Sequence, residues 1–271
     1  MGIPLSTLST YLCRSEQRLI DRQVGLMVRN LALRTSSSQR FGPAARVCDS
    51  PFANVATGHS TPRGSTSWVA AFASLMEGIL RDAEDMSVLL PYEEIRMHMS
   101  RLSWRLSAVT IPRLLVVNAG DETNLMIQRD GEGSSSGIES IKITGLRDWS
   151  QGVFGDPLLC ICFEDPSEGF LEGWRQDGTD DIIEDLEGGK SRLLLYNCYR
   201  AVVLIVTQYY RRQTDSSRQE LDGRKKLTAA LVELEKVDIG PGDVSKRGRS
   251  GSIFGVCGKP GKRLRLESEH S

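Results

Sequence analysis

The chain has 271 residues, a formal net charge of −1 and 39% hydrophobic residues, which is ordinary for a globular protein. The near-neutral charge argues against binding to nucleic acid or an anionic membrane through the whole surface, so any such role needs a local patch. The most apolar segment, residues 193–206, is interrupted by Asn197 and Arg200 and is too short to cross a bilayer. The six cysteines lack the spacing of a metal site and predict reduced thiols in a cytoplasmic protein.

Apolar side chains at helical spacing predict three helices in the first part of the chain. Residues 15–33 form the first, Ser67 caps the second and Pro91 opens the third. Phe41-Gly42-Pro43 predicts a turn, and residues 48–67, rich in Gly, Pro, Ser and Thr, predict a long loop. The stripes that define the helices comprise Ile20, Val24, Met27, Val28 and Leu31 in the first, Trp68, Phe72, Leu75, Met76 and Ile79 in the second, and Ile95, Met99, Leu102 and Leu106 in the third.

The pattern changes at Pro112. Short β-rich runs at residues 113–117, 125–127 and 141–144 predict a small antiparallel or hairpin element. Beyond Pro157 the chain is predicted to be helical again. Two helices stand out there, a buried one that is apolar on nearly every face and an amphipathic one, covering residues 192–210 and 217–237.

The last residues differ in character from the rest of the chain. Basic clusters at residues 246–249 and 262–265 lie among Gly and Ser, a composition typical of a disordered, solvated tail. The alternative is a tail that directs the protein to the nucleus or contacts nucleic acid.

The most informative segment covers residues 114–157. In it, Asn124 precedes the strand Leu125-Met126-Ile127, and a second motif reads ITGLRDW, with its Asp at 148, before Gly155-Asp156-Pro157. These motifs resemble those of the aminoglycoside phosphotransferase and choline kinase group, and within it the large set of fungal members. In that group the catalytic loop reads H-x-D-x-x-x-x-N before a strand, and the metal-binding motif reads I-T-G-I-I-D-W before a G-D-P turn.

The resemblance implies an α+β, mainly helical fold: the large C-terminal lobe of a protein-kinase-like fold, with a small β-hairpin element at the catalytic and metal-binding loops. It covers residues 15–240, with residues 1–14 as an N-terminal stub and residues 241–271 as the basic tail. In the family a strand-rich, nucleotide-holding lobe comes first, and the stub is too short for such a sheet. We therefore expect that lobe to be missing, through truncation or because this is a one-lobed relative.

The activity that the resemblance implies is phosphoryl transfer from ATP to a small-molecule hydroxyl, with Mg²⁺ as the metal. Asp148 would then hold Mg²⁺ against the ATP phosphates, and Asn124 would donate its side-chain oxygen to the same ion, because Mg²⁺ prefers hard oxygen ligands. The alternative for Asp148 is a structural cap or brace of its loop.

The catalytic loop departs from the family pattern. Counting back from Asn124 puts Val117 at the family's His and Ala119 at its catalytic Asp, and alanine cannot accept a proton. Asp121 is a candidate substitute base, although its carboxylate should leave the loop in another direction. We therefore expect weak or absent transfer. The alternative function is a non-catalytic, pseudokinase-type binding or scaffold protein that self-associates through the face uncovered by the missing lobe.

Three further features allow two interpretations each. His98 lies beside the apolar stripe of its helix, and we predict that it is a surface or rim residue rather than a base. A tyrosine group at helical spacing predicts core and rim packing, with an acceptor cleft as the alternative; it comprises Tyr196, Tyr199, Tyr209 and Tyr210. An acidic run predicts a solvated helix or loop, with a negative surface for a cationic acceptor as the alternative; it comprises Asp177, Asp180, Asp181, Glu184, Asp185 and Glu187.

Overall fold

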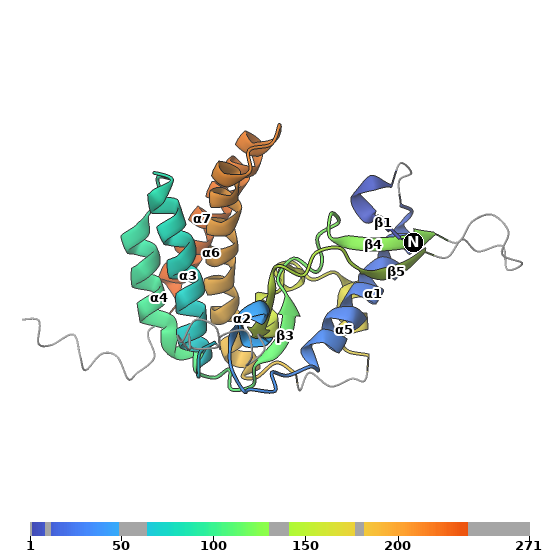
Figure 1. Cartoon of the computed structure of the whole chain (residues 1–271), viewed down its shortest axis with the longest axis horizontal. Coiled ribbons are helices and arrows are strands. Elements are labelled where there is room, and N and C mark those ends of the chain that lie inside the picture. Colours follow the sequence, from blue (N-terminus) through green and yellow to red (C-terminus); the bar gives the residue numbers. More distant parts are fainter. Residues whose placement is uncertain (1, 9–11, 49–63, 130–140, 177–181, 238–271) are drawn as a thin grey trace, which may run out of the picture. The chain divides into compact units, whose positions relative to one another are not determined.

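The computed structural model describes residues 2–8, 12–48, 64–129, 141–176 and 182–237, all within one compact unit, Met1–Val237. This part is α+β and mainly helical, as predicted (Figure 1). Its helices are α1 (Arg14–Ala32), α2 (Ala44–Cys48), α3 (Trp68–Asp85), α4 (Tyr92–Leu106), α5 (Glu168–Trp174), α6 (Leu186–Tyr210) and α7 (Ser216–Lys236). The tail predicted for residues 241–271 lies outside the described residues.

The strands form two small antiparallel sheets, where the sequence predicted one element. The first has the order β1-β4-β5 and the second the order β2-β6-β3. The run at residue 113 is therefore not a neighbour of the other two predicted strands, because its backbone pairs with β6 instead. The strands are β1 (Ile3–Pro4), β2 (Gly42–Pro43), β3 (Arg113–Val116), β4 (Leu125–Arg129), β5 (Ile141–Leu146) and β6 (Gly152–Gly155).

The N-terminal residues add to both sheets. Ile3 and Pro4 pair with Met126 and Ile127 of β4, so part of the predicted stub extends the first sheet. Gly42 and Pro43, predicted as a turn, instead lie in β2, and α2 was not predicted at all. Most of the loop predicted for residues 48–67 lies outside the described residues.

The long helices follow their predicted apolar stripes. α1 buries Ile20, Val24 and Val28, and packs against α5, whereas α3, α4, α6 and α7 pack on one another (Figure 1). Ser67 caps α3 as predicted, because its hydroxyl accepts a hydrogen bond from the Ala70 amide at 3.3 Å. No helix in the described part of the chain is both long and apolar enough to span a membrane.

His98 lies in the core, so the prediction of a surface or rim position was wrong. Its side chain is 1% exposed on α4, and its Nδ1 lies 3.1 Å from the Arg101 guanidinium. Burial, and then the nearby charge of Arg101, lower the pKa of His98. The imidazole is therefore a neutral core group between α4 and α7, with Glu235 3.6 Å from its Nε2.

Gly155, at the end of β6, touches the indole ring of Trp68. A Cβ at this position would lie 2.3 Å from one ring carbon of Trp68, which is fully buried and cannot move aside freely. We expect Gly155→Ala to lower the free energy of unfolding by ~1–3 kcal/mol, the usual cost of overpacking a core. Urea unfolding measures it, with Gly78→Ala as the control, since a Cβ there meets nothing beyond the backbone of its own helix, and alanine inside α3 should raise stability by ~0.5–1 kcal/mol. An unchanged midpoint in Gly155→Ala would contradict this close packing.

Candidate functional site

Asn124 ties together the two loops that flank β4 and β5. Its side-chain oxygen accepts a hydrogen bond from the Asp148 amide at 2.7 Å, and its Nδ2 donates to the Asp148 carbonyl at 3.1 Å. Nδ2 also lies 3.2 Å from Oδ1 of Asn118. The Asn124 side chain is buried, 3% exposed, and both ends of its amide are satisfied by the protein.

Asp148 lies beside Asn124, but its carboxylate turns to its own loop. Oδ1 accepts from the Ser150 amide at 2.8 Å and Oδ2 from the Ser150 hydroxyl at 2.7 Å. These two hydrogen bonds, the backbone one first, lower the pKa of Asp148. The side chain is exposed to solvent, so the carboxylate is ionised at neutral pH and accessible to a cation.

Each oxygen of the predicted metal-binding pair already accepts one hydrogen bond from the protein. The Asn124 oxygen points at the Asp148 amide, so one of its two lone pairs is already engaged. Both oxygens of the exposed Asp148 carboxylate are held by Ser150, and among the described residues no group of three or more His, Cys, Asp or Glu side chains can hold a metal ion. The Asn124 amide therefore braces the two loops.

The remaining predicted residues lie on the loop between β3 and β4, some facing a pocket and one facing the core. Val117 and Asp121 are half-buried and line a pocket, whereas Ala119, at the family's catalytic position, is 0% exposed and belongs to the core. Oδ1 of Asp121 accepts hydrogen bonds from the Thr123 amide at 2.8 Å and the Thr123 hydroxyl at 2.6 Å. Its second carboxylate oxygen has no partner among the described residues, so Asp121 can still accept a hydrogen bond from a ligand.

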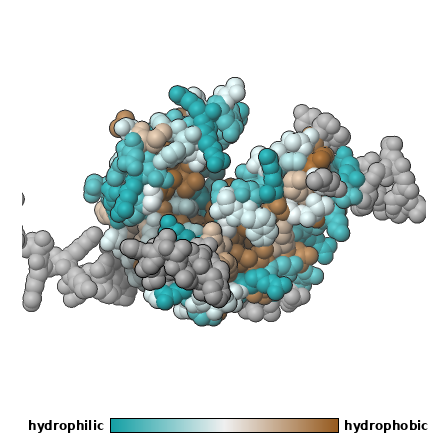
Figure 2. All heavy atoms as spheres, viewed as in Figure 1, coloured by the Kyte–Doolittle hydropathy of each residue, from teal (hydrophilic) through white to brown (hydrophobic). Residues whose placement is uncertain are grey.

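A pocket of about 670 Å³ lies beside this loop. Its walls come from α3, α6, α7, the loop before β4 and the start of β6, and most of its lining side chains are apolar. Figure 2 shows hydrophobic residues on the helical wall of the hollow that faces the sheet of β4 and β5. The volume is typical of small-molecule sites, which are mostly apolar with a few placed polar groups. Its polar and charged members are Asn118, Asp121, Ser150, Gln151, Glu164, Asn197, Arg200, Thr207, Gln208, Lys226 and Glu233.

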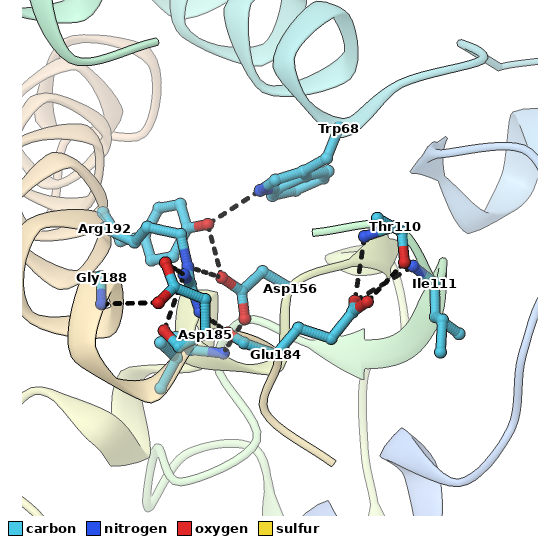
Figure 3. Close-up of polar contacts among 10 residues, drawn as sticks. Trp68, Thr110, Ile111, Asp156, Glu184, Asp185, Gly188 and Arg192 are labelled. Atoms are coloured by element: carbon cyan, nitrogen blue, oxygen red, sulfur yellow. Dashed lines mark hydrogen bonds and ion pairs between the residues drawn. The ribbon is translucent and has the colours of Figure 1, made fainter. Parts of the chain in front are cut away.

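A buried polar network holds the base of α6 to the loop after β6 (Figure 3). Asp156 accepts from Arg192 Nε at 2.7 Å and from the Tyr196 hydroxyl at 2.8 Å, and that hydroxyl also accepts from the Trp68 indole at 2.8 Å. Burial raises the pKa of Asp156, against the opposing effect of the Arg192 guanidinium. The sequence predicted only a Gly-Asp-Pro turn here and assigned no role to Asp156 or Arg192.

Two described members of the acidic run are structural braces. Glu184 accepts from the amides of Thr110 and Ile111 at 3.0 and 3.1 Å, which fastens the segment before β3. Asp185 caps α6 through the Gly188 amide at 3.1 Å and lies 3.4 Å from Arg192 (Figure 3). Glu187 is exposed, and Asp177, Asp180 and Asp181 lie outside the described residues.

The tyrosine group divides between the core and the pocket. Tyr196 is fully buried and packs edge-on against Phe72, with ring centroids 5.0 Å apart, which confirms the predicted core packing. Tyr199 also packs on Phe72 and lines the pocket. Tyr209 and Tyr210 are exposed beyond it.

Sequence reasoning missed the charged cluster on the pocket wall. Arg200 was noted only as an interruption of an apolar helix, and its neighbours Glu164 and Lys226 come from distant parts of the chain. A signal did exist, because a charge inside an otherwise apolar helix must find a partner or a functional use. The same signal pointed to Arg192.

Comparisons with known proteins identify the fold. No protein-family model matches the sequence, and no curated protein matches it. The structure is similar to that of a thermostable mutant of the aminoglycoside phosphotransferase APH(4)-Ia, solved as a ternary complex with AMP-PNP and hygromycin B. The TM-score is 0.51 at 14% sequence identity, and the match covers 88% of this chain and 70% of that one. The chain therefore has an aminoglycoside-phosphotransferase-like, kinase-like fold.

Proposed function

We propose that this protein is a small-molecule-binding domain of aminoglycoside-phosphotransferase-like fold that transfers phosphoryl groups weakly or not at all. The observation that carries the proposal is the double hydrogen bond between the Asn124 amide and the backbone of Asp148. In a working site of this kind both side chains serve a metal and ATP. In this protein the Asn124 side chain holds the loop that carries Asp148.

The buried methyl group of Ala119 supports the same conclusion. No carboxylate stands at the position that the resemblance assigns to the catalytic base, and Asp121, two residues further on, is held by Thr123. Loss of a general base costs about 10²–10⁴-fold in rate. Binding makes no such demand, because it needs only a shaped, largely apolar cavity, and the pocket beside the loop supplies one.

A transfer assay with the whole chain tests this proposal. We expect phosphate release from Mg-ATP, with and without a panel of hydroxylated small molecules, to stay at the level of the Asp148→Ala variant, within about twofold. The physical reason is that Ser150 holds the Asp148 carboxylate and the Asp148 amide engages the Asn124 oxygen, so removing the carboxylate should remove little catalysis. Radiolabelled ATP gives the sensitivity needed.

The control variant is Asp165→Ala, which removes an exposed carboxylate outside the pocket lining. If the unaltered chain transfers phosphate to an acceptor, and Asp148→Ala abolishes the transfer while Asp165→Ala does not, the protein is an active phosphotransferase and the proposal fails.

A further inference from the structure

The pocket of the proposed function has an uneven charge distribution. Its apolar walls come from α3 and α6, where Leu75, Ile79, Leu194 and Leu204 are half-buried and leave the cavity open. Its cations, Arg200 and Lys226, stand together on α6 and α7 and share one carboxylate, Glu164. The cluster of these three side chains therefore carries one positive charge in excess.

Arg200 is the unusual member of this cluster. Its side chain is 9% exposed, and its two terminal nitrogens donate to the Leu159 carbonyl and to Oδ1 of Asn197. Its Nε, however, has no hydrogen-bond partner among the described residues, and the nearest carboxylate oxygen, on Glu164, is 3.8 Å away. The Nε itself is sealed from solvent, so a ligand would act on Arg200 through its charge: a buried guanidinium whose nearest carboxylate oxygen is this far away is costly, and an anion in the cavity would offset that cost.

Glu164 does not fully balance the charge of Arg200, because it lies closer to Lys226. The Lys226 ammonium is 2.9 Å from Oε1 of Glu164, a hydrogen-bonding distance that Arg200 Nε does not reach. Two other carboxylates line the pocket: Glu233 lies 2.6 Å from the Lys236 ammonium, and Asp121 holds Thr123 with one oxygen and keeps its negative charge, so the positive excess is confined to the wall of Arg200 and Lys226.

Resting on the small-molecule binding proposed above, we propose that the pocket takes an amphipathic monoanion. Its apolar body, a ring system or short chain, lies against the leucines of α3 and α6, and its carboxylate lies against Arg200 and Lys226. A polycation is the ligand this wall disfavours, because it would bring further positive charge to a cluster that already has an excess.

Three probes that share one apolar body and differ in charge test this inference: 2-naphthoate, 2-naphthol and 2-naphthylmethylammonium. By titration calorimetry at neutral pH we expect naphthoate to bind about tenfold or more tightly than naphthol, the gain typical of a hydrogen bond to a buried charge. The ammonium probe should bind most weakly. Leu204→Trp, which fills the cavity, should abolish binding, whereas Leu221→Trp, exposed on α7 outside the lining, should not.

Two charge variants should change the affinity for naphthoate in opposite directions. Glu164→Gln frees both cations and should tighten naphthoate binding several-fold, while Lys226→Met, at a half-exposed position, should weaken it by about two- to fivefold. Neither change should alter naphthol binding, and circular dichroism checks that each variant is folded. Arg200→Met is left out of the test, because Arg200 also donates to the Leu159 carbonyl and its loss would disturb the fold.

The possible outcomes separate the two proposals. Equal or tighter binding of naphthol or of the ammonium probe, lost in Leu204→Trp, would overturn the anionic ligand class and leave small-molecule binding in place. Weaker naphthoate binding in Glu164→Gln would also overturn it. If no probe binds and a library of drug-sized molecules gives no change in melting temperature, small-molecule binding itself is refuted.

Discussion

Replacing Asp156 by alanine is expected to lower the free energy of unfolding by ~3–5 kcal/mol, the cost of leaving a buried charge without its partner. Arg192, 0% exposed, would lose the carboxylate 2.7 Å from its Nε and would keep the carbonyls of Glu184 and Asp185 and the more distant, half-exposed Asp185 carboxylate at 3.4 Å. The Tyr196 hydroxyl would lose its acceptor at the same time. Urea unfolding followed by circular dichroism measures the change.

Asp165→Ala is the matched control for this experiment. It removes a carboxylate of the same type from an exposed position, so its effect should stay within about 0.5 kcal/mol. A second comparison, Tyr196→Phe, removes only the hydroxyl of the network and should cost about 1–3 kcal/mol, because the Trp68 indole then loses its buried acceptor. A loss below 1 kcal/mol in Asp156→Ala would show that the network contributes little to stability.

The sequence predicted the long helices because their signal is local. The stripe of Ile20, Val24 and Val28 defines the buried face of α1 without reference to the rest of the chain. Ser67, a residue type that often caps helices, predicts the start of α3. His98 could have been placed correctly by the same reasoning. It lies three residues after Ile95 and four before Leu102, which is the spacing of the stripe itself.

The sheets were predicted less well because their pairing is not local. β6 contains only Gly-Val-Phe-Gly and has no alternating pattern of its own, yet it lies between β2 and β3 at the centre of its sheet. Two-residue strands such as β1 carry no periodicity at all. Their existence depends on backbone groups of β4 that the tertiary fold leaves available.

The candidate site divides in the same way. The resemblance correctly brought Asn124 and Asp148 together, because motif order preserves the topology of a fold. It could not show that the amide would face the backbone of Asp148. The charge of Arg200 inside an apolar helix indicated that it must have a partner, but the identity of its partners was beyond prediction, since Glu164 and Lys226 follow no spacing and meet Arg200 only when three elements pack.

Introducing a carboxylate by Ala119→Asp is expected to destabilise the protein by about 3–5 kcal/mol without producing phosphoryl transfer, because position 119 is enclosed by the core. The family pattern suggests the opposite result, a repaired catalytic base facing the cleft. Asn118→Asp is the matched control. It puts the same charge one residue earlier, on the pocket wall, and keeps an oxygen for the Asn124 amide, so it should cost less than about 1 kcal/mol.

The stability of Ala119→Asp should depend on pH, whereas a loss of stability caused by overpacking alone would not. Burial should raise the pKa of the introduced carboxyl in the folded state, while in the unfolded chain it stays at about 3.9. Ionisation then favours the unfolded state above that pH, so the loss of stability should grow as the pH rises from 4 to about 7, and should be smallest in acid. Urea midpoints across this range measure it. A stable variant with a pH-independent midpoint and new transfer activity would place residue 119 in the cleft, and the domain would then be a kinase disabled by one side chain.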